Sequence, residues 1–540
     1  MNRLFRKFNK KLLILFLIGI VFFIIYSFLG NNLFKSNSDI EKIYNSPDET
    51  ANYTFSQTYY ENNVLNFKDE ANAVAGKIVS PRSMRVINGL TVPASFLGMP
   101  LLYGLISKVI SIKFIDYLTP FIAIIGVFIF YFLIKLLFNK KIAFWSAILL
   151  FINPAFWYYS SKSMMPNILF ISLFIFTLYF TVLSIQKRKI YFYLLSAIFL
   201  AFCLMVRTSA IVWILPLLII LGLFNYSRLK WEYIILSALV FIIVFSPIFY
   251  FNFLSYGHIL SIGYDFGLEL SKTNLFSKSI SLMQSIFLPF GFHLKTAISN
   301  TWSYTFKLFP LWSIIYLIGL LLFSFKAITK RKYDELMYLF LFITFSGYLI
   351  IYYGSWEFHD NPDPNLITIG TSYVRYFLPI YIFLIPIVIH SIYNLYTRQK
   401  YILPVVSVIL FLVLGFNSYQ VVYLSEGDGL KDVKNTLNEY QVIAKEVKGL
   451  TEDKAIIIAE RMDKVFFPSR SVIFKLNNDN DYLAVNQLIE AGYPVYYFNF
   501  TRTEEELNKF NDKYFTKFNL EVGKSIHDFK EQSLYSINKL

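Results

Sequence analysis

The chain has 540 residues, of which 56% are hydrophobic, 19% aromatic and only 16% charged. Soluble domains are usually under half apolar and about a quarter charged, so this composition excludes an ordinary soluble protein. The formal net charge of +15 does not indicate a nucleic-acid-binding surface, because much of the basic excess lies in short loops between apolar runs, as in membrane proteins.

The first apolar run predicts a retained membrane span. A basic segment, residues 1–11, precedes an apolar stretch from about Leu12 to Leu29 that no small-residue cleavage site follows. Because basic flanks mark the cytoplasmic side, we expect a cytoplasmic amino terminus and an outside loop over residues 30–114.

Later basic loops orient the remaining spans. Lysine and arginine cluster at 135–141, 187–189, 228–230, 326–332 and 398–400, whereas loops such as 161–167 and 354–374 carry almost none. If every basic loop is cytoplasmic, the chain crosses the plasma membrane about eleven times. The spans expected after the first lie near 115–134, 142–160, 168–185, 190–206, 209–224, 233–251, 308–325, 333–353, 376–396 and 401–420.

One apolar segment, residues 91–112, does not fit this count. It is broken by Pro93, Gly98, Pro100 and Gly104, and a full crossing would reverse every later loop. We therefore expect a helix that lies on or dips into the outer face. The alternative is that this segment spans and a neighbouring one does not.

The composition changes after about residue 424, which predicts two domains. Residues 1–424 form an all-α polytopic membrane domain with outside loops at 30–114 and 252–307, and residues 425–540 form a small extracytoplasmic α/β domain. In the second domain we expect strands at 455–459, 471–474 and 494–498 and helices at 430–449, 482–491 and 503–515. It carries no recognised catalytic signature and is interpreted as an accessory or acceptor-binding domain.

Two adjacent carboxylates, Asp48 and Glu49, stand in the first outside loop. Such a pair suits general-base catalysis, since one carboxylate can accept a proton while the other orients it or shifts its pKa. The alternative is a helix start, because acidic residues after a proline stabilise the first turn of a helix.

Several motifs follow one another in the order found in a known family. Asp48-Glu49 is followed by Tyr53, and Arg375-Tyr-Phe-Leu-Pro-Ile-Tyr381 is similar to a motif that opens a late span. Val92–Leu102, Asn153-Pro154, Val206-Arg207-Thr208, Tyr256-Gly257 and Gly263-Tyr264 add looser matches. Over about residues 1–420 the chain resembles the GT-C class of integral-membrane glycosyltransferases, such as the protein O-mannosyltransferases and the aminoarabinose transferases of lipid A.

The resemblance implies a catalytic mechanism. Asp48 would be the base that activates the acceptor for inverting attack at the sugar, and Glu49 would support it. Arg375, Arg207 and Lys162 would bind the donor phosphate, since guanidinium pairs with phosphate oxygens. For each cation the alternative is a flanking or snorkelling side chain.

Further residues complete the predicted site. Tyr53 and Tyr264 are expected to line the acceptor or donor pocket, and Arg82 or Arg85 could assist as point charges. Many relatives place a carboxylate in the second outside loop, but Ser160–Asn167 has none. Because hard divalent cations prefer carboxylate ligands, we expect no cofactor and no obligatory metal.

A second acidic cluster, Glu357 to Asp363 with His359 and Asp360, is interpreted as a solvated loop, with a metal site or acceptor contact as the alternative. The predicted function is transfer of a sugar from a polyprenyl-phosphate-linked donor to a lipid, glycan or protein acceptor outside the bilayer. The alternatives are a transporter or flippase of lipid-linked saccharides and a polysaccharide polymerase or ligase. A transporter would show repeated halves with polar breaks at mid-membrane, and no repeat is seen.

Overall fold

The computed structural model describes residues 10–28, 42–264, 286–360, 363, 366–395 and 402–540. The chain divides into two compact units. The helical unit comprises residues 1–31, 116–246 and 267–432, and the α/β unit comprises residues 32–115, 247–266 and 433–540. The first outside loop and the carboxyl-terminal segment therefore share one unit, although they are far apart in the sequence.

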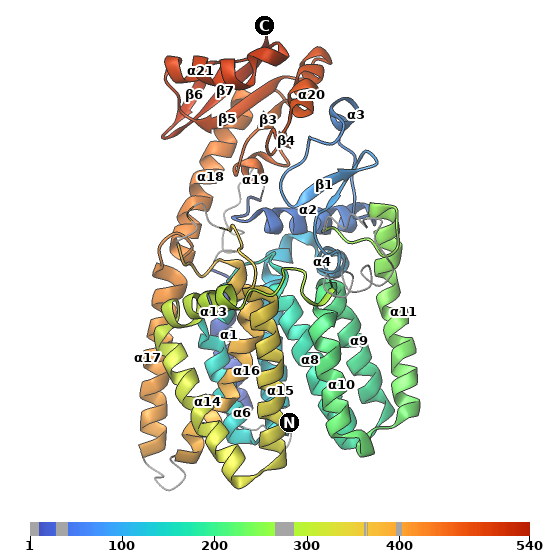
Figure 1. Ribbon diagram of the computed structural model, residues 1–540, viewed down its shortest axis with the longest axis vertical. Coiled ribbons are helices and arrows are strands. Elements are labelled where there is room, and N and C mark those ends of the chain that lie inside the picture. Colours follow the sequence, from blue (N-terminus) through green and yellow to red (C-terminus); the bar gives the residue numbers. More distant parts are fainter. Residues whose placement is uncertain (1–9, 29–41, 265–285, 361–362, 364–365, 396–401) are drawn as a thin grey trace, which may run out of the picture. The chain divides into compact units, whose positions relative to one another are not determined.

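The helical unit consists of helices, several of which follow one another with only a few residues between them (Figure 1). Its helices are α1 Lys10–Tyr26, α5 Leu118–Leu137, α6 Lys140–Ile152, α7 Pro154–Ser161, α8 Pro166–Lys187, α9 Ile190–Val206, α10 Ile211–Phe224, most of α11 Trp231–Tyr256, α13 Leu294–Trp302, α14 Pro310–Lys330, α15 Tyr333–Gly354, α16 Ser372–Leu395 and α17 Ile402–Leu424. Prolines at the first helical turn, Pro154, Pro166 and Pro310, start three of them, where the missing N–H costs nothing.

The predicted membrane spans all coincide with helices of this unit. Among the described residues, seven helices are long and apolar enough to cross a membrane, or up to eight if α6 and α7, which meet at a bend of 56°, form one span. Three further expected spans fall on shorter helices: α1 and α9 have 17 residues and α10 has 14. The predicted fold class, a polytopic helical membrane protein, is confirmed.

Helices α8 and α16 form the centre of the helical unit. In their apolar windows 72% and 78% of residues are buried, against 17% for α11 and 22% for α17, which expose apolar side chains as a lipid-facing helix does. Figure 1 shows α16 running beside α15, and it also packs on α14, α6 and α7. A Cβ at Gly126 would lie 2.5 Å from Ser172 Oγ, so this glycine allows α5 to approach α8 closely.

The α/β unit is built around a mixed five-stranded sheet. Its helices are α2 Pro47–Asn62, α3 Asn72–Ala75, α4 Gly98–Ile110, most of α18 Leu430–Leu450, α19 Asp463–Phe466, α20 Asp479–Glu490 and α21 Glu504–Tyr514. The strands are β1 Met84–Ile87, β2 Leu90–Pro93, β3 Ile456–Ile458, β4 Ser471–Ile473, β5 Val495–Phe500, β6 Leu520–Phe529 and β7 Gln532–Lys539. The sheet order is β4-β3-β5-β7-β6, with β4, β3 and β5 parallel and β7 antiparallel to both β5 and β6.

The predicted α/β organisation of the carboxyl-terminal segment is confirmed. The three expected strands correspond to β3, β4 and β5, and the three expected helices to α18, α20 and α21. The hairpin β6–β7 was not predicted, because most of β6 is exposed and polar and lacks an apolar alternation. Ala71, Ala75 and Val79, around α3, enter the same core as Ile456 and Val485, which binds the first outside loop to the sheet.

The segment expected to lie on the outer face forms a short helix. Helix α4 has 13 residues, too few for a span, and packs against α2. A Cβ at Gly104 would lie 2.8 Å from the Ser56 carbonyl oxygen, so α2 and α4 touch through this glycine. The amino-terminal part of the predicted segment 91–112 differs from the prediction. Residues 90–93 form strand β2, which pairs with β1 in a hairpin.

Candidate functional site

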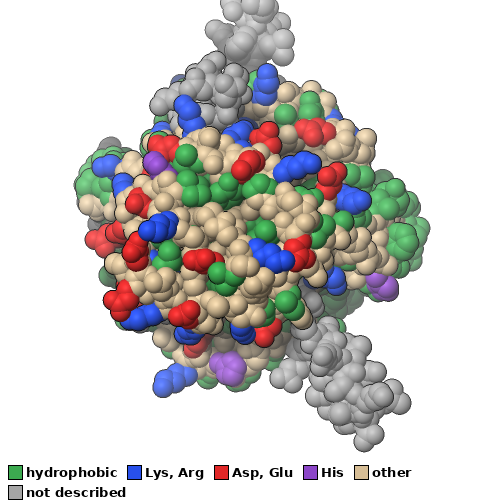
Figure 2. All heavy atoms as spheres, turned by 90° about the horizontal axis from the view of Figure 1, so that it is seen from above, with side chains coloured by type: hydrophobic (Ala, Val, Ile, Leu, Met, Phe, Trp, Pro, Cys, Tyr) green, Lys and Arg blue, Asp and Glu red, His purple; other side chains and the backbone are tan. Residues whose placement is uncertain are grey.

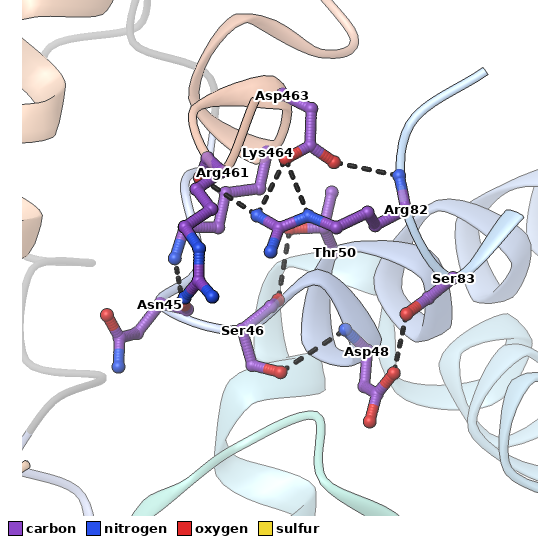
Figure 3. Close-up of polar contacts among 9 residues, drawn as sticks. All are labelled: Asn45, Ser46, Asp48, Thr50, Arg82, Ser83, Arg461, Asp463 and Lys464. Carbon is purple, nitrogen blue, oxygen red and sulfur yellow. Dashed lines mark hydrogen bonds and ion pairs between the residues drawn. The ribbon is translucent and has the colours of Figure 1, made fainter. Parts of the chain in front are cut away.

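Helix α2 begins just before the predicted carboxylate pair, and the two carboxylates make different contacts. Figure 3 shows the contacts of Asp48. Ser46 is the N-cap, and its hydroxyl accepts from the Asp48 N–H. Glu49, only 3% exposed, accepts from the Ser46 N–H at 3.2 Å and completes a capping box. The alternative interpretation of the acidic pair, that it marks the start of a helix, therefore holds for Glu49.

Asp48 is half-buried beside Glu49 and reaches a different group. Its Oδ1 atom accepts a hydrogen bond of 2.6 Å from the Ser83 hydroxyl, which comes from the loop before β1. This bond orients the carboxylate, as a positioned base requires. The buried Glu49 thus closes the helix cap and Asp48 does not, and the role of Asp48 as a base stays a prediction.

The next residue back along the loop, Arg82, is paired with a buried carboxylate (Figure 3). Its backbone N–H donates to Asp463 Oδ2 at 2.8 Å, and its Nε and Nη2 donate to Asp463 Oδ1 at 2.9 and 2.7 Å. Asp463 is completely buried, and the neighbouring Lys464 donates to the Asn45 carbonyl oxygen. Arg82 therefore serves to hold the loop that carries Ser83 rather than to assist a phosphate.

In the helical unit, two of the predicted phosphate-binding arginines meet on one aromatic ring. The guanidinium carbon of Arg207 lies 4.9 Å from the centre of the Tyr376 ring, and that of Arg375 lies 5.4 Å from it. The Tyr376 ring also stacks on Tyr353 at 4.1 Å with an interplanar angle of 5°, and it contacts Phe358. Residues from the end of α9 and the start of α16 are thus brought together, and their role in phosphate binding stays a prediction.

Arg207 is buried, with 8% of its surface exposed. Its Nη2 donates to Asn167 Oδ1 at 2.8 Å, and its guanidinium also contacts the Phe170 ring. Over the described part of the chain, no carboxylate lies within ion-pair distance of Arg207, and the buried Asn167 Nδ2 has no hydrogen-bond acceptor. A cation and an N–H donor thus lie together without an anion among the described residues.

Arg375 belongs to a polar network at the start of α16. Its Nη2 donates to Ser372 Oγ at 2.6 Å, and the Ser372 hydroxyl and N–H donate to Asp360 at 2.9 and 2.6 Å. Asp360 lies in an exposed loop, as predicted, and it also caps this helix, whose N-terminal dipole favours a carboxylate. The local sequence of Trp356–Asp363 does not indicate the contact between Asp360 and Ser372, because the two residues are separated by a loop.

Asp428 is a further polar residue of this region that the sequence did not single out. It accepts from the Thr368 hydroxyl, and a Cβ at Gly370 would lie 2.5 Å from its Oδ2. The Tyr159 hydroxyl donates to the Thr371 carbonyl oxygen at 2.9 Å, which ties α7 to the loop before α16.

Of the remaining predicted site residues, Lys162 belongs to the helical unit, and Tyr53 and Tyr264 belong to the α/β unit. Lys162, 4% exposed, ends α7 and lies 5.9 Å from the Tyr158 ring, in the turn that leads to Asn167. In the α/β unit, the Tyr53 ring packs on Tyr44 at 5.4 Å, and the Tyr264 ring on Phe96 at 5.1 Å. A role of Tyr53 and Tyr264 in the pocket stays a prediction.

Arg85, in the α/β unit, donates to the Ile262 carbonyl oxygen at 3.1 Å and lies over the Tyr256 ring. Tyr256 in turn donates to the Pro93 carbonyl oxygen at 2.9 Å. The residues around the loose Tyr256-Gly257 and Gly263-Tyr264 matches thus pack on the end of β2. Among the described residues, no group of three or more His, Cys, Asp or Glu side chains is arranged to hold a metal ion.

Residues 104–251 match a family model described as dolichyl-phosphate-mannose-protein mannosyltransferase. No curated protein matches the sequence. Among solved structures, the chain is similar to ArnT from Cupriavidus metallidurans bound to undecaprenyl phosphate, with 9% identity, a TM-score of 0.57 and 97% of each chain covered. It is also similar to the oligosaccharyltransferase AglB from Archaeoglobus fulgidus, solved with an inhibitory peptide and a dolichol-phosphate, with 10% identity, a TM-score of 0.53, and 91% of this chain and 70% of that chain covered.

These identities are low, so the two structures establish the fold, and the family model adds a sequence match within the membrane part. The chain is therefore a multi-span membrane protein with the GT-C glycosyltransferase fold, as its motifs predicted.

Proposed function

We propose that this chain transfers a sugar from a polyprenyl-phosphate-linked donor to an acceptor at the outer face of the membrane. The observation that supports this most is the state of Arg207, buried among Asn167, Phe170 and Tyr376 with no carboxylate in ion-pair distance among the described residues. Burying a charge is costly unless it is paired, so an anionic ligand is the expected partner. Undecaprenyl phosphate, the molecule named with the ArnT structure, belongs to the proposed class of ligand.

The leaving group of the reaction is a phosphate, and its charge rises as the bond to the sugar breaks. Arg207 and Arg375 act on it as guanidinium donors, which bind phosphate oxygens in pairs. Lys162, at the end of α7, adds a point charge. Positive groups aimed at the developing charge lower the barrier because they interact more strongly with the transition state than with the bound donor.

Asp48 acts as the base. It accepts the proton of an acceptor hydroxyl or amine while the acceptor atom forms a bond to the anomeric carbon and the bond from that carbon to the phosphate oxygen breaks. Attack from the side opposite the phosphate inverts the configuration at that carbon. The bond from Ser83 keeps the carboxylate oriented, and the capping box of Glu49 keeps the start of α2 rigid.

The reaction takes place on the extracytoplasmic side, because the basic loops of the chain mark the opposite side as cytoplasmic. The acceptor is a lipid, a glycan or a protein. Cysteine labelling can test on which side of the membrane α2 lies, since the single cysteine of the chain, Cys203, is buried. In a Cys203→Ser background, Glu61→Cys on the exposed face of α2 should react with an impermeant maleimide added outside intact cells. Labelling only after the cytosol is exposed would contradict the proposal.

The function itself is tested with purified protein in lipid and a panel of polyprenyl-phosphate sugars, following which donor is consumed. Arg207→Met should lower kcat/KM for that donor by roughly 30-fold or more, since truncating one partner of a buried charge pair costs about 2–5 kcal/mol. Arg228→Lys, at an exposed arginine of a basic loop, is the matched control and should not change the rate. Consumption of no donor, or an Arg207→Met rate within about threefold of the parent, would refute the proposal.

A further inference from the structure

The α/β unit contains a cavity of about 350 Å³ that the proposed transfer does not use. It lies at the carboxyl ends of the parallel strands β4, β3 and β5. Among its lining residues, Phe474 follows β4, Glu460 follows β3, and Tyr497 lies on β5. In open α/β sheets, this edge is where ligands bind, and the volume lies within the range of small-molecule sites.

Aromatic side chains form the wall of this cavity, namely Phe474, Tyr482, Tyr497, Phe510, Tyr514 and Phe515. They pack on one another rather than standing singly: the Tyr497 and Phe510 rings are 5.7 Å apart and the Phe510 and Tyr514 rings 5.2 Å apart. Tyr514 keeps 36% of its surface exposed. A rigid ring surface therefore borders space that a ligand can enter.

Polar groups stand among the rings. Asn499 Nδ2 donates to the Tyr497 hydroxyl at 2.7 Å, which leaves the phenol proton for a ligand. Burial raises the pKa of Tyr497 above its ordinary value, so this proton is present at neutral pH. Arg502 lies 4.2 Å above the Phe510 ring, and Lys475 and Glu460 form an ion pair of 3.7 Å with half of each side chain exposed. Donors and acceptors are thus both present.

The surrounding helix ends disfavour a phosphorylated ligand. Helix amino termini with open N–H groups are common phosphate-binding sites. The start of α20 is closed by a capping box of Asn478 and Asp481, and that of α21 by one of Thr503 and Glu506. Both first turns carry further acidic residues, which would repel an anion.

We propose that this cavity binds a neutral saccharide. The C–H face of a sugar ring carries partial positive charge and packs on the negative face of an aromatic ring, while its hydroxyls pair with groups such as Asn499, Glu460 and Lys475. None of the residues that line this cavity has a role in the proposed transfer, so the inference goes beyond the proposed function and does not depend on it.

The test uses the full-length protein in lipid nanodiscs and saturation-transfer NMR with mannobiose, cellobiose and chitobiose as probes, and UMP as the charged comparison. At least one neutral disaccharide should bind and UMP should not. Tyr514→Ala should weaken binding by about two- to tenfold, the range for the loss of one aromatic contact, and Tyr514→Phe should retain it.

The matched control is Phe500→Ala, because Phe500 is 63% exposed and lies at the end of the same strand as Tyr497 but does not line the cavity. This variant should bind like the parent. No disaccharide binding at about 10 mM, an unchanged affinity of Tyr514→Ala, or binding of UMP alone would each overturn the inference. Since no donor is present in this assay, its failure would not affect the sugar-transfer proposal.

Discussion

The two neighbouring carboxylates of α2 should respond differently to the same isosteric change. Asp48→Asn removes the base but leaves an oxygen to accept from Ser83, so transfer should fall by about 10²- to 10⁴-fold while the fold is kept. Glu49→Gln keeps an oxygen for the Ser46 N–H, and glutamine also completes a capping box, so transfer should stay within roughly threefold of the parent. Glu49→Ala loses the box and should cost about 1 kcal/mol of stability.

The assay measures initial rates of donor consumption with purified protein in lipid, using the donor found in the panel. Each variant is compared at equal amounts of monodisperse protein, and thermal unfolding monitors the stability. If Glu49→Gln loses as much activity as Asp48→Asn, the two residues share the catalytic task and the division drawn from the capping geometry is wrong. If Asp48→Asn keeps activity within tenfold of the parent, Asp48 is not the base.

Three further predictions concern the residues that support this helix. Ser83→Ala removes the bond that orients Asp48, and should lower kcat by about two- to tenfold with little change in donor KM. Gly104→Leu pushes α4 away from α2, and should lower stability by about 1–3 kcal/mol in thermal unfolding. Arg82→Ala and Asp463→Ala should each cost about 3–5 kcal/mol, and the double variant less than their sum, when stability is followed by urea-dependent proteolysis. Additive costs would show that this pair is not coupled.

The membrane helices and the order of the carboxyl-terminal elements were predictable from the sequence because both depend on local patterns. Apolar length and loop charge identify spans without reference to tertiary contacts. Capping boxes mark α20 and α21, and apolar periodicity or apolar runs mark α18 and the three parallel strands. One local signal was overlooked: Asn88-Gly89, where both residues have positive φ, is a hairpin turn between β1 and β2.

The polar contacts of the candidate site were less predictable because their partners lie far apart in the chain. Asp463 is 381 residues from Arg82, and Asp428 is 60 residues from Thr368. Local sequence around Asp360 suggests a polar loop, and only the return of the chain at Ser372 makes it a helix cap. Pairing of this kind depends on tertiary structure, to which periodicity and composition are insensitive.

The arginines illustrate how burial and counter-charge separate structural from functional candidates. By local sequence, Arg82 and Arg207 each stand next to a hydroxyl residue at an expected outer position, and only the family resemblance favoured Arg207 as a phosphate ligand. Arg82 meets a completely buried carboxylate, so its charge is already compensated within the fold. Arg207 meets an amide and aromatic rings, which attract a cation but carry no net charge. Burying Arg207 without an ion pair among the described residues is costly, and this cost is the reason for proposing an anionic ligand there. We expect a phosphate, because its oxygens pair well with a guanidinium group.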